Sequence, residues 1–227
     1  MENRKIIEVI SIIKKAKYNA YLVGGSSRDL LYCRDFDDID IATNAPLDFI
    51  KKTFKVKDNQ GEKMGSVKIT YKNTIMEITR FREDLYNKKT IYPEKVKFVN
   101  TPIEDAKRRD FTINAIYIDL TTNQLIDQYD GLKDLMAFQI KFIGDPKERI
   151  IEDPTRILRG IRLAYKLNFT IEENTKKAFI DNINELERIS NNKYQKLILK
   201  MVEELGETKT ARILQEYHLG RESYEHQ

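Results

Sequence analysis

A change of pattern near residues 138–150 constrains the fold of this chain more than any other feature. Before it, short apolar runs typical of strands alternate with helical periodicity, and after it every apolar stripe has helical spacing. The later helices are expected at residues 154–167, 172–188, 191–205 and 208–217. This pattern predicts an α+β protein, with a mixed sheet and flanking helices in residues 1–140 and an all-helical part in residues 141–227.

The first part carries recognisable strand and helix signals. Strands are expected at residues 21–23, 39–42, 116–120 and 125–127, helices at 26–32 and 46–54, and a hairpin at 66–81 around Lys72-Asn73. Thr101 and Glu104 have the spacing of a capping box, with Pro102 at the first position of the helix that follows. These signals place turns and caps where a compact sheet domain needs them.

Composition narrows the classes of function. No apolar run is long enough to span a membrane, and the N-terminal apolar residues follow helical periodicity without a cleavage site, so neither a membrane segment nor a signal peptide is expected. One cysteine excludes an internal disulfide, and with two histidines a zinc cluster is not expected. We therefore expect a cytoplasmic protein. The formal net charge of +4 includes an acidic stretch at 35–48 and basic residues recurring over 141–200, which allows a nucleic-acid partner without requiring one.

Two carboxylates on one strand face point to a metal ion. Asp38 and Asp40 are two residues apart in a short strand, so their side chains lie on the same face. Like charges this close repel each other unless a cation lies between them. Glu77 is the candidate for the third carboxylate that two-metal phosphoryl transfer needs. The alternative is an exposed acidic turn and, at Glu77, an ordinary exposed strand residue.

A Gly-Gly turn precedes these carboxylates. Gly24 and Gly25 end a strand and open a helix, where bare backbone N–H groups can hold a phosphate. Arg28, in the first turn of that helix, can either add a phosphate contact or pair with Asp29. A glycine pair alone is weak evidence, since most such pairs are ordinary turns. Beside the two aspartates, it predicts adjacent sites for a triphosphate and a metal ion.

A second constellation opens the helix at 154–167. Asp153 is a natural N-cap, and Arg156 and Arg159 follow at spacings of three along one side. The buried side is expected to consist of Ile157, Leu158, Ile161 and Ala164. A carboxylate acceptor beside a guanidinium donor matches the amino group and ring nitrogen of cytosine and adenine. Uracil and guanine present a carbonyl acceptor beside an N–H donor, so the same pair disfavours them. The alternative is a plain cap with solvated arginines.

Four ordered motifs resemble those of one family. VGGSSRDLLYCRDFDDIDIAT (23–43) closely resembles the first motif of class II tRNA nucleotidyltransferases, the CCA-adding enzymes, and of related bacterial poly(A) polymerases. RRDFTINAIYID (108–119), DQYDGLKDL (127–135) and EDPTRILRGIRLAYKLNFTIEENT (152–175) resemble the second, hinge and nucleotide-reading motifs. The resemblance covers about residues 20–190. Ser27 stands where the family usually has Val, a departure that affects packing.

The resemblance implies a fold, a reaction and site residues. It implies a polymerase-β-like nucleotidyltransferase head followed by a helical neck, and template-independent addition of C and A from CTP and ATP to the 3′ end of tRNA. Asp38, Asp40 and Glu77 would be catalytic, with Mg²⁺ held by Asp38 and Asp40. Residues expected to bind the nucleotide are Gly24, Gly25, Arg28, Arg109, Asp110, Asn114, Asp153, Arg156 and Arg159. Arg109 and Asp110 would contact its phosphate and ribose, and Asn114 would support that site.

Two departures from the family leave alternatives open. Segment 82–98 has the length of the family's flexible loop, which is linked to addition of the final A, but its usual basic pair falls on Ile91-Tyr92, with Lys88-Lys89 slightly earlier. Full family members carry further helical domains that grip tRNA, and this chain stops soon after the neck. A fragment, a natural minimal enzyme, and half of an assembly completed by a homodimer or partner chain are all consistent with that length.

Three rival functions are weighed beside CCA addition. A poly(A) polymerase shares the motifs but uses only ATP, and products formed with CTP and ATP separately distinguish the two. A nucleotidyltransferase of the toxin–antitoxin type shares the glycine and aspartate elements but lacks RRDFTINA and the reading helix. A non-catalytic RNA-binding subunit is disfavoured by the intact carboxylate set, and metal-dependent label incorporation excludes it.

Overall fold

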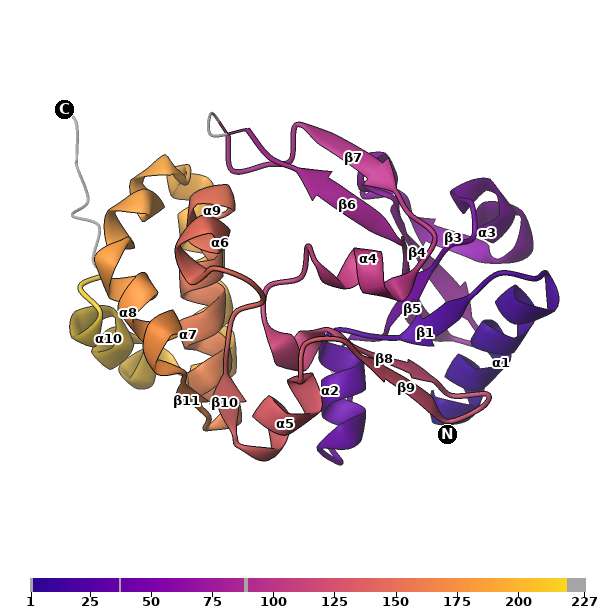
Figure 1. Ribbon diagram of the computed structural model, residues 1–227, viewed down its shortest axis with the longest axis horizontal. Helices are drawn as coiled ribbons and strands as arrows, with labels where there is room; N and C mark the ends of the chain where they lie inside the picture. Colours follow the sequence, from indigo (N-terminus) through magenta and orange to yellow (C-terminus); the bar gives the residue numbers. More distant parts are fainter. Residues whose placement is uncertain (1, 37, 88–89, 220–227) are drawn as a thin grey trace. The chain divides into compact units, whose positions relative to one another are not determined.

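The computed structural model describes residues 2–36, 38–87 and 90–219 (Figure 1). The chain divides into two compact units, one of Met1–Asn87 with Pro93–Ala137 and one of Lys88–Tyr92 with Phe138–Gln227. The first contains a mixed sheet with helices and the second is mainly helical, so the predicted α+β fold class is confirmed. No helix of the described residues is both long and apolar enough to cross a membrane.

The first unit is built on a seven-stranded sheet with the order β3-β4-β5-β2-β1-β8-β9. β2 and β5 pair in parallel, and the other neighbours pair antiparallel. The strands are β1 (Ala20–Leu22), β2 (Asp40–Thr43), β3 (Lys55–Asp58), β4 (Ser66–Tyr71), β5 (Thr74–Arg80), β8 (Ile116–Asp119) and β9 (Gln124–Asp127). Both hairpins expected from the sequence, β4–β5 and β8–β9, are present.

Alternation along the strands gives this sheet an apolar and a polar face. Pairing register puts the following buried side chains on the apolar face: Leu22, Ile41, Val67, Ile69, Met76, Ile78 and Ile118. Helices α1 (Glu2–Lys15) and α2 (Gly25–Leu31) contact β1 and β8, and α3 (Leu47–Thr53) contacts β3. Figure 1 shows α1 and α2 on one side of these strands and α4 (Pro102–Ala106) on the other. The polar face carries Asp40, Lys68 and Glu77.

Segment 82–98, which has the length of the family's flexible loop, is paired at both ends. β6 (Arg82–Leu85) and β7 (Lys95–Phe98) form an antiparallel pair that the sequence did not predict. Their sequences, REDL and KVKF, are too charged to show apolar alternation, which is why periodicity missed them. Lys88 and Lys89 lie outside the described residues.

Caps and short turns complete the first unit. The predicted capping box is present: the Glu104 amide donates to Thr101 Oγ1 at 3.3 Å and the Thr101 amide to Glu104 Oε2 at 3.1 Å. The remaining elements are α5 (Gly131–Met136) and the 3₁₀ turns η1 (Glu62–Met64) and η2 (Thr112–Asn114).

The second unit consists of five helices among the described residues and one short strand pair. Its helices are α6 (Pro146–Glu152), α7 (Thr155–Leu167), α8 (Glu173–Asp181), α9 (Asn191–Leu205) and α10 (Glu207–Glu216), with the 3₁₀ turn η3 (Ile183–Arg188). The expected buried stripe of α7 is confirmed, since Ile157, Leu158, Ile161 and Ala164 are all buried. The sequence did not predict α6, capped by Asp145, or the parallel pair of β10 (Gln139–Ile140) and β11 (Thr170–Ile171).

Candidate active site

The parallel pairing of β2 and β5 brings two predicted carboxylates together. In its register Asp40 lies directly opposite Glu77, although 37 positions separate them in the sequence. Asp38 lies just before β2 and is exposed, whereas Asp40 and Glu77 are half-buried. Asp40 and Glu77 therefore meet on the polar face of the sheet, and Asp38 lies near them at the start of β2.

The surroundings of Asp40 raise the pKa of its carboxyl group. Burial and the neighbouring Glu77 carboxylate raise the pKa of Asp40 to about 6, Asp38 adds to the rise, and Arg109 and Lys68 oppose it. The charged form is disfavoured because negative charge accumulates where water is partly excluded. A cation between these carboxylates would remove that penalty.

Gly24 lies against the Asp40 carboxylate. Its backbone, with φ 72° and ψ −139°, lies in a region that essentially only glycine adopts. A Cβ added there would be 3.0 Å from Asp40 Oδ2 and 3.7 Å from Arg109 Nη1. The first predicted glycine is therefore required by backbone conformation and by close approach, and it brings Arg109 beside Asp40. Gly25 follows as the first residue of α2, beside the Arg28 guanidinium.

Two serines hold the turn in place: Ser26, which the sequence did not point to, and Ser27, for which it indicated only an effect on packing. The Ser26 hydroxyl accepts from the Asp40 amide at 2.7 Å and donates to the Asp38 carbonyl at 2.9 Å, so it fixes the backbone on both sides of Ile39. Ser27 is fully buried and donates to the Gly24 carbonyl at 3.2 Å. The hydroxyl that replaces the family's usual Val is thus satisfied inside the protein.

A buried acid orients Arg109. Asp105 accepts hydrogen bonds from Arg109 Nη2 at 3.1 Å, the Tyr117 hydroxyl at 2.6 Å and Arg108 Nε at 2.8 Å. Burial alone would raise the pKa of Asp105, but the two arginines, the Tyr117 hydroxyl and the Arg82 amide lower it to about 2. Arg109 Nε also donates to the Tyr117 hydroxyl at 2.8 Å.

A second network joins the remaining predicted residues of this unit. Arg28 is buried and donates to Asp29 Oδ1 through Nε and Nη2, and to Asn114 Oδ1 through Nη1 at 2.9 Å. Asn114 Nδ2 in turn donates to Asp110 Oδ1 at 3.3 Å. Of the two alternatives for Arg28, the structure therefore has the pairing with Asp29, and the guanidinium also links α2 to η2 and Asp110.

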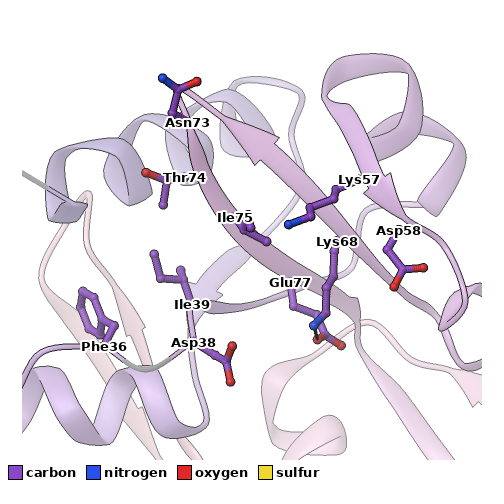
Figure 2. A pocket seen from close by; sticks show the side chains of 10 residues that line it. All are labelled: Phe36, Asp38, Ile39, Lys57, Asp58, Lys68, Asn73, Thr74, Ile75 and Glu77. Atoms are coloured by element: carbon purple, nitrogen blue, oxygen red, sulfur yellow. Dashed lines mark ion pairs between the residues drawn. The ribbon is translucent and has the colours of Figure 1, made fainter.

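Glu77 is held by polar neighbours on β4. The Ser66 hydroxyl donates to Glu77 Oε1, and Thr79 Oγ1 lies 3.2 Å from Ser66 Oγ. Lys68 Nζ lies 3.9 Å from Glu77 Oε2, and Figure 2 shows this pair with the Asp38 carboxylate pointing toward it. Ser66 and Lys68, neither of them predicted, thus orient the third carboxylate.

The carboxylates do not form a closed cage. Within residues 2–36, 38–87 and 90–219, no three His, Cys, Asp or Glu side chains are arranged to hold a metal ion. The complete three-carboxylate cage expected from the sequence is therefore not preformed, because the negative charges repel one another and Glu77 turns to Ser66 and Lys68. Oxygen ligands at Asp38 and Asp40 still suit Mg²⁺, which commonly uses one or two carboxylates together with substrate phosphates.

The predicted base-reading residues belong to the second unit. Asp153 Oδ1 accepts from the Thr155 amide at 3.0 Å and the Thr155 hydroxyl at 2.6 Å. The N-cap of α7 is Pro154, so the predicted N-cap position of Asp153 is wrong by one residue, and Asp153 ends α6 instead. Arg156 is 3% exposed and donates to Glu152 Oε2 and the Arg149 carbonyl, both at 2.7 Å. Arg159 is half-buried. The alternative of a solvated arginine is therefore excluded for Arg156. Glu152 and Arg149 also belong to this hydrogen-bond network, and residue spacing did not reveal them.

The fold and the site define a family. Residues 20–141 match the family model of the poly A polymerase head domain, which is more than half of the chain. The chain therefore belongs to the poly A polymerase head-domain family.

Curated proteins that are similar to this chain are CCA-adding enzymes. The chain is 39% identical over 216 residues to a CCA-adding enzyme of Lactobacillus johnsonii, covering 95% of this chain and 54% of the relative. It is 40% identical over 189 residues to that of Enterococcus faecalis, covering 83% and 46%. The chain thus spans about half the length of the curated relatives it matches.

Solved structures of CCA-adding enzymes are also similar to this chain. The crystal structure of a Bacillus stearothermophilus CCA-adding enzyme in complex with CTP is similar with a TM-score of 0.82 and 30% identity, covering 96% of this chain and 52% of that one. A Thermotoga maritima CCA-adding enzyme complexed with tRNA has a TM-score of 0.74 and 26% identity, covering 94% and 50%.

Proposed function

We propose that this chain transfers nucleotides from CTP and ATP to the 3′ end of tRNA without a nucleic-acid template. The observation that carries the proposal is the grouping of Asp40, Glu77, Gly24 and Arg109 at one point of the sheet. The names of the similar proteins, CCA-adding enzymes, and the CTP and tRNA in two of their structures support the choice of substrates.

The reaction would be an in-line displacement at phosphorus. The 3′-hydroxyl oxygen of the RNA bonds to the α-phosphorus, the bond to the pyrophosphate oxygen breaks, and the hydroxyl proton leaves to water. Arg109, fixed by Asp105 and Tyr117, would stabilise the triphosphate beside Gly24 and Gly25. Asp110 would contact the ribose, with Asn114 and Arg28 holding it in position.

Asp38 and Asp40 would hold Mg²⁺, with Glu77 as the third carboxylate of the site. When bound, this ion would lower the pKa of the 3′-hydroxyl and stabilise charge on the leaving group. The raised pKa of Asp40 supports the assignment, because a neighbouring cation would restore the charged form.

The second unit would select the base. The Asp153 carboxylate would accept a hydrogen bond from the amino group of cytosine or adenine, and Arg156 and Arg159 would donate hydrogen bonds to the ring nitrogen. Burial and bonds to Glu152 and the Arg149 carbonyl would hold Arg156 ready for this contact. Residues 1–140 would thus be the catalytic head and residues 141–227 the helical neck. We also propose a cytoplasmic location, since tRNA and nucleoside triphosphates are found there.

Addition of A alone is the second candidate, favoured by the description of the matching family model. One experiment distinguishes the two. The chain is incubated with Mg²⁺, tRNA ending at position 73, 74 or 75, and each labelled nucleotide separately, and the products are sequenced. C at positions 74 and 75 followed by A at 76 is expected; A-only extension identifies the second candidate, and no incorporation with any substrate refutes both. Light scattering of the same protein tests for a homodimer.

A further inference from the structure

A pocket beside the carboxylates is lined by charged side chains of both signs. It has a volume of about 470 Å³, within the range of about 300–1,000 Å³ of small-molecule sites. Its charged lining residues are the carboxylates Asp38, Asp58 and Glu77 and the lysines Lys57 and Lys68. Figure 2 shows the pocket over β4 and β5, with Phe36 at one end and the Lys57 side chain extending from β3 toward Ile75.

An irregularity in β3 puts both Lys57 and Asp58 at this pocket. The register against β4 shifts between Val56 and Asp58, so an extra residue, Lys57, enters the strand opposite Lys68. Such bulges re-aim a side chain that regular alternation would direct elsewhere. Asp58 is partly satisfied by its own turn, where its Oδ1 accepts from the Gln60 amide at 2.9 Å.

The pocket lies away from the proposed triphosphate position. The Asp40 carboxylate contacts Gly24 and lies near Arg109. Asp38 and Glu77 instead line the pocket together with residues of β3 and β4. In an in-line displacement the attacking oxygen approaches the phosphorus opposite the leaving group. If pyrophosphate leaves on the side of Gly24 and Arg109, the hydroxyl must arrive from the side of this pocket.

The charges suit a ribose-phosphate once a divalent cation binds Asp38 and its neighbours. That cation offsets the carboxylates, and Lys57 and Lys68 then supply positive charge next to the reacting hydroxyl. Lys68, paired with Glu77 at 3.9 Å, is 46% exposed in its side chain and can turn to a phosphate. The half-buried Phe36 ring offers a surface on which a base can stack.

We propose that this pocket binds the 3′-terminal nucleotide of the acceptor RNA, with Lys57 and Lys68 contacting its phosphate. The inference rests on the proposed function and deepens it, since it names the residues that receive the second substrate.

The test uses Lys57→Gln, Lys68→Gln and the double variant of the full chain. Lys55→Gln is the matched control, because Lys55 is an exposed lysine of the same strand that does not line the pocket. KM for an acceptor-stem RNA hairpin with one unpaired 3′ nucleotide and KM for CTP are measured separately. Fluorescence anisotropy gives the affinity for the same hairpin at several salt concentrations, without turnover.

Each pocket variant should weaken hairpin binding and raise its KM roughly ten- to hundredfold, as expected when a charged hydrogen bond is removed, and Lys57→Gln should leave KM for CTP unchanged. The slope of log affinity against log salt should fall by about 0.7 for each phosphate that the variant no longer neutralises. Since Lys68 also faces Glu77, Lys57→Gln is the cleaner variant.

An unchanged hairpin affinity, an equal rise in KM for CTP, or the same loss of affinity in Lys55→Gln would overturn the inference. If the unaltered chain incorporates no nucleotide, the proposed function fails instead. The anisotropy series then still decides whether Lys57 and Lys68 bind RNA.

Discussion

Replacing Gly24 by Ala tests whether the turn before α2 positions Asp40. The conformation of Gly24, φ 72° and ψ −139°, would cost a non-glycine residue about 1–3 kcal/mol. The new Cβ would also stand 3.0 Å from Asp40 Oδ2, closer than a relaxed contact, so the carboxylate has to move. The contact requires a shift of a few tenths of an ångström. Because a misplacement of about 1 Å at a reacting centre lowers the rate about 100-fold, this smaller shift should lower it severalfold.

Gly206→Ala is the matched control for this experiment. Gly206 has φ 83° and ψ 157°, and a Cβ there would have no neighbour within 4 Å. Both variants should lose about 1–3 kcal/mol of unfolding free energy in urea titrations. Only Gly24→Ala should lower labelled CTP incorporation, severalfold. If both variants keep full activity, or both lose it equally, the contact between Gly24 and Asp40 does not position the carboxylate.

Three further predictions concern single carboxylates. Asp38→Ala and Asp40→Ala should each abolish incorporation while leaving unfolding free energy at pH 7 unchanged or higher, because repulsion is removed; activity equal to that of the unaltered chain would refute the metal assignment. Asp105→Asn should cost about 3–5 kcal/mol at pH 7, since two arginines lose a buried partner. The pKa of Asp105 is lowered to about 2, so its stabilisation is complete above about pH 4 and disappears toward pH 2; urea titrations of the two proteins should converge over that range. Asp153→Ala should retain chemistry but use UTP better relative to CTP, and an unaltered CTP preference would refute the base-reading role.

The sequence predicted the elements that carry an uninterrupted local signal. The stripe of Ile157, Leu158 and Ile161 gave α7 to within one residue, and Thr101 with Glu104 marked the start of α4. β6 and β7 escaped because charged residues conceal their alternation, and β10 with β11 escaped because two-residue strands have no periodicity.

The sequence pointed to the charged residues of the candidate site, whose roles stay predictions, but not to the groups that hold them. Asp40 and Glu77 followed from residue type and strand face, yet their pairing depends on strand order, which no local pattern encodes. Ser26, Ser66 and Asp105 act through contacts with distant segments. A buried serine or aspartate gives no sequence signal that separates such a role from an ordinary turn or cap.

The parallel pairing of β2 and β5 has a consequence for the order of folding. Parallel neighbours need a crossover, and here α3, β3 and β4 all lie in sequence between the two strands. Closing a segment of that length costs chain entropy before the contacts between β2 and β5 can stabilise it. The hairpins β4–β5 and β8–β9 can form early from local contacts, whereas Asp40 meets Glu77 only when the crossover closes. We therefore expect the carboxylate group to be assembled late in folding, after the two hairpins.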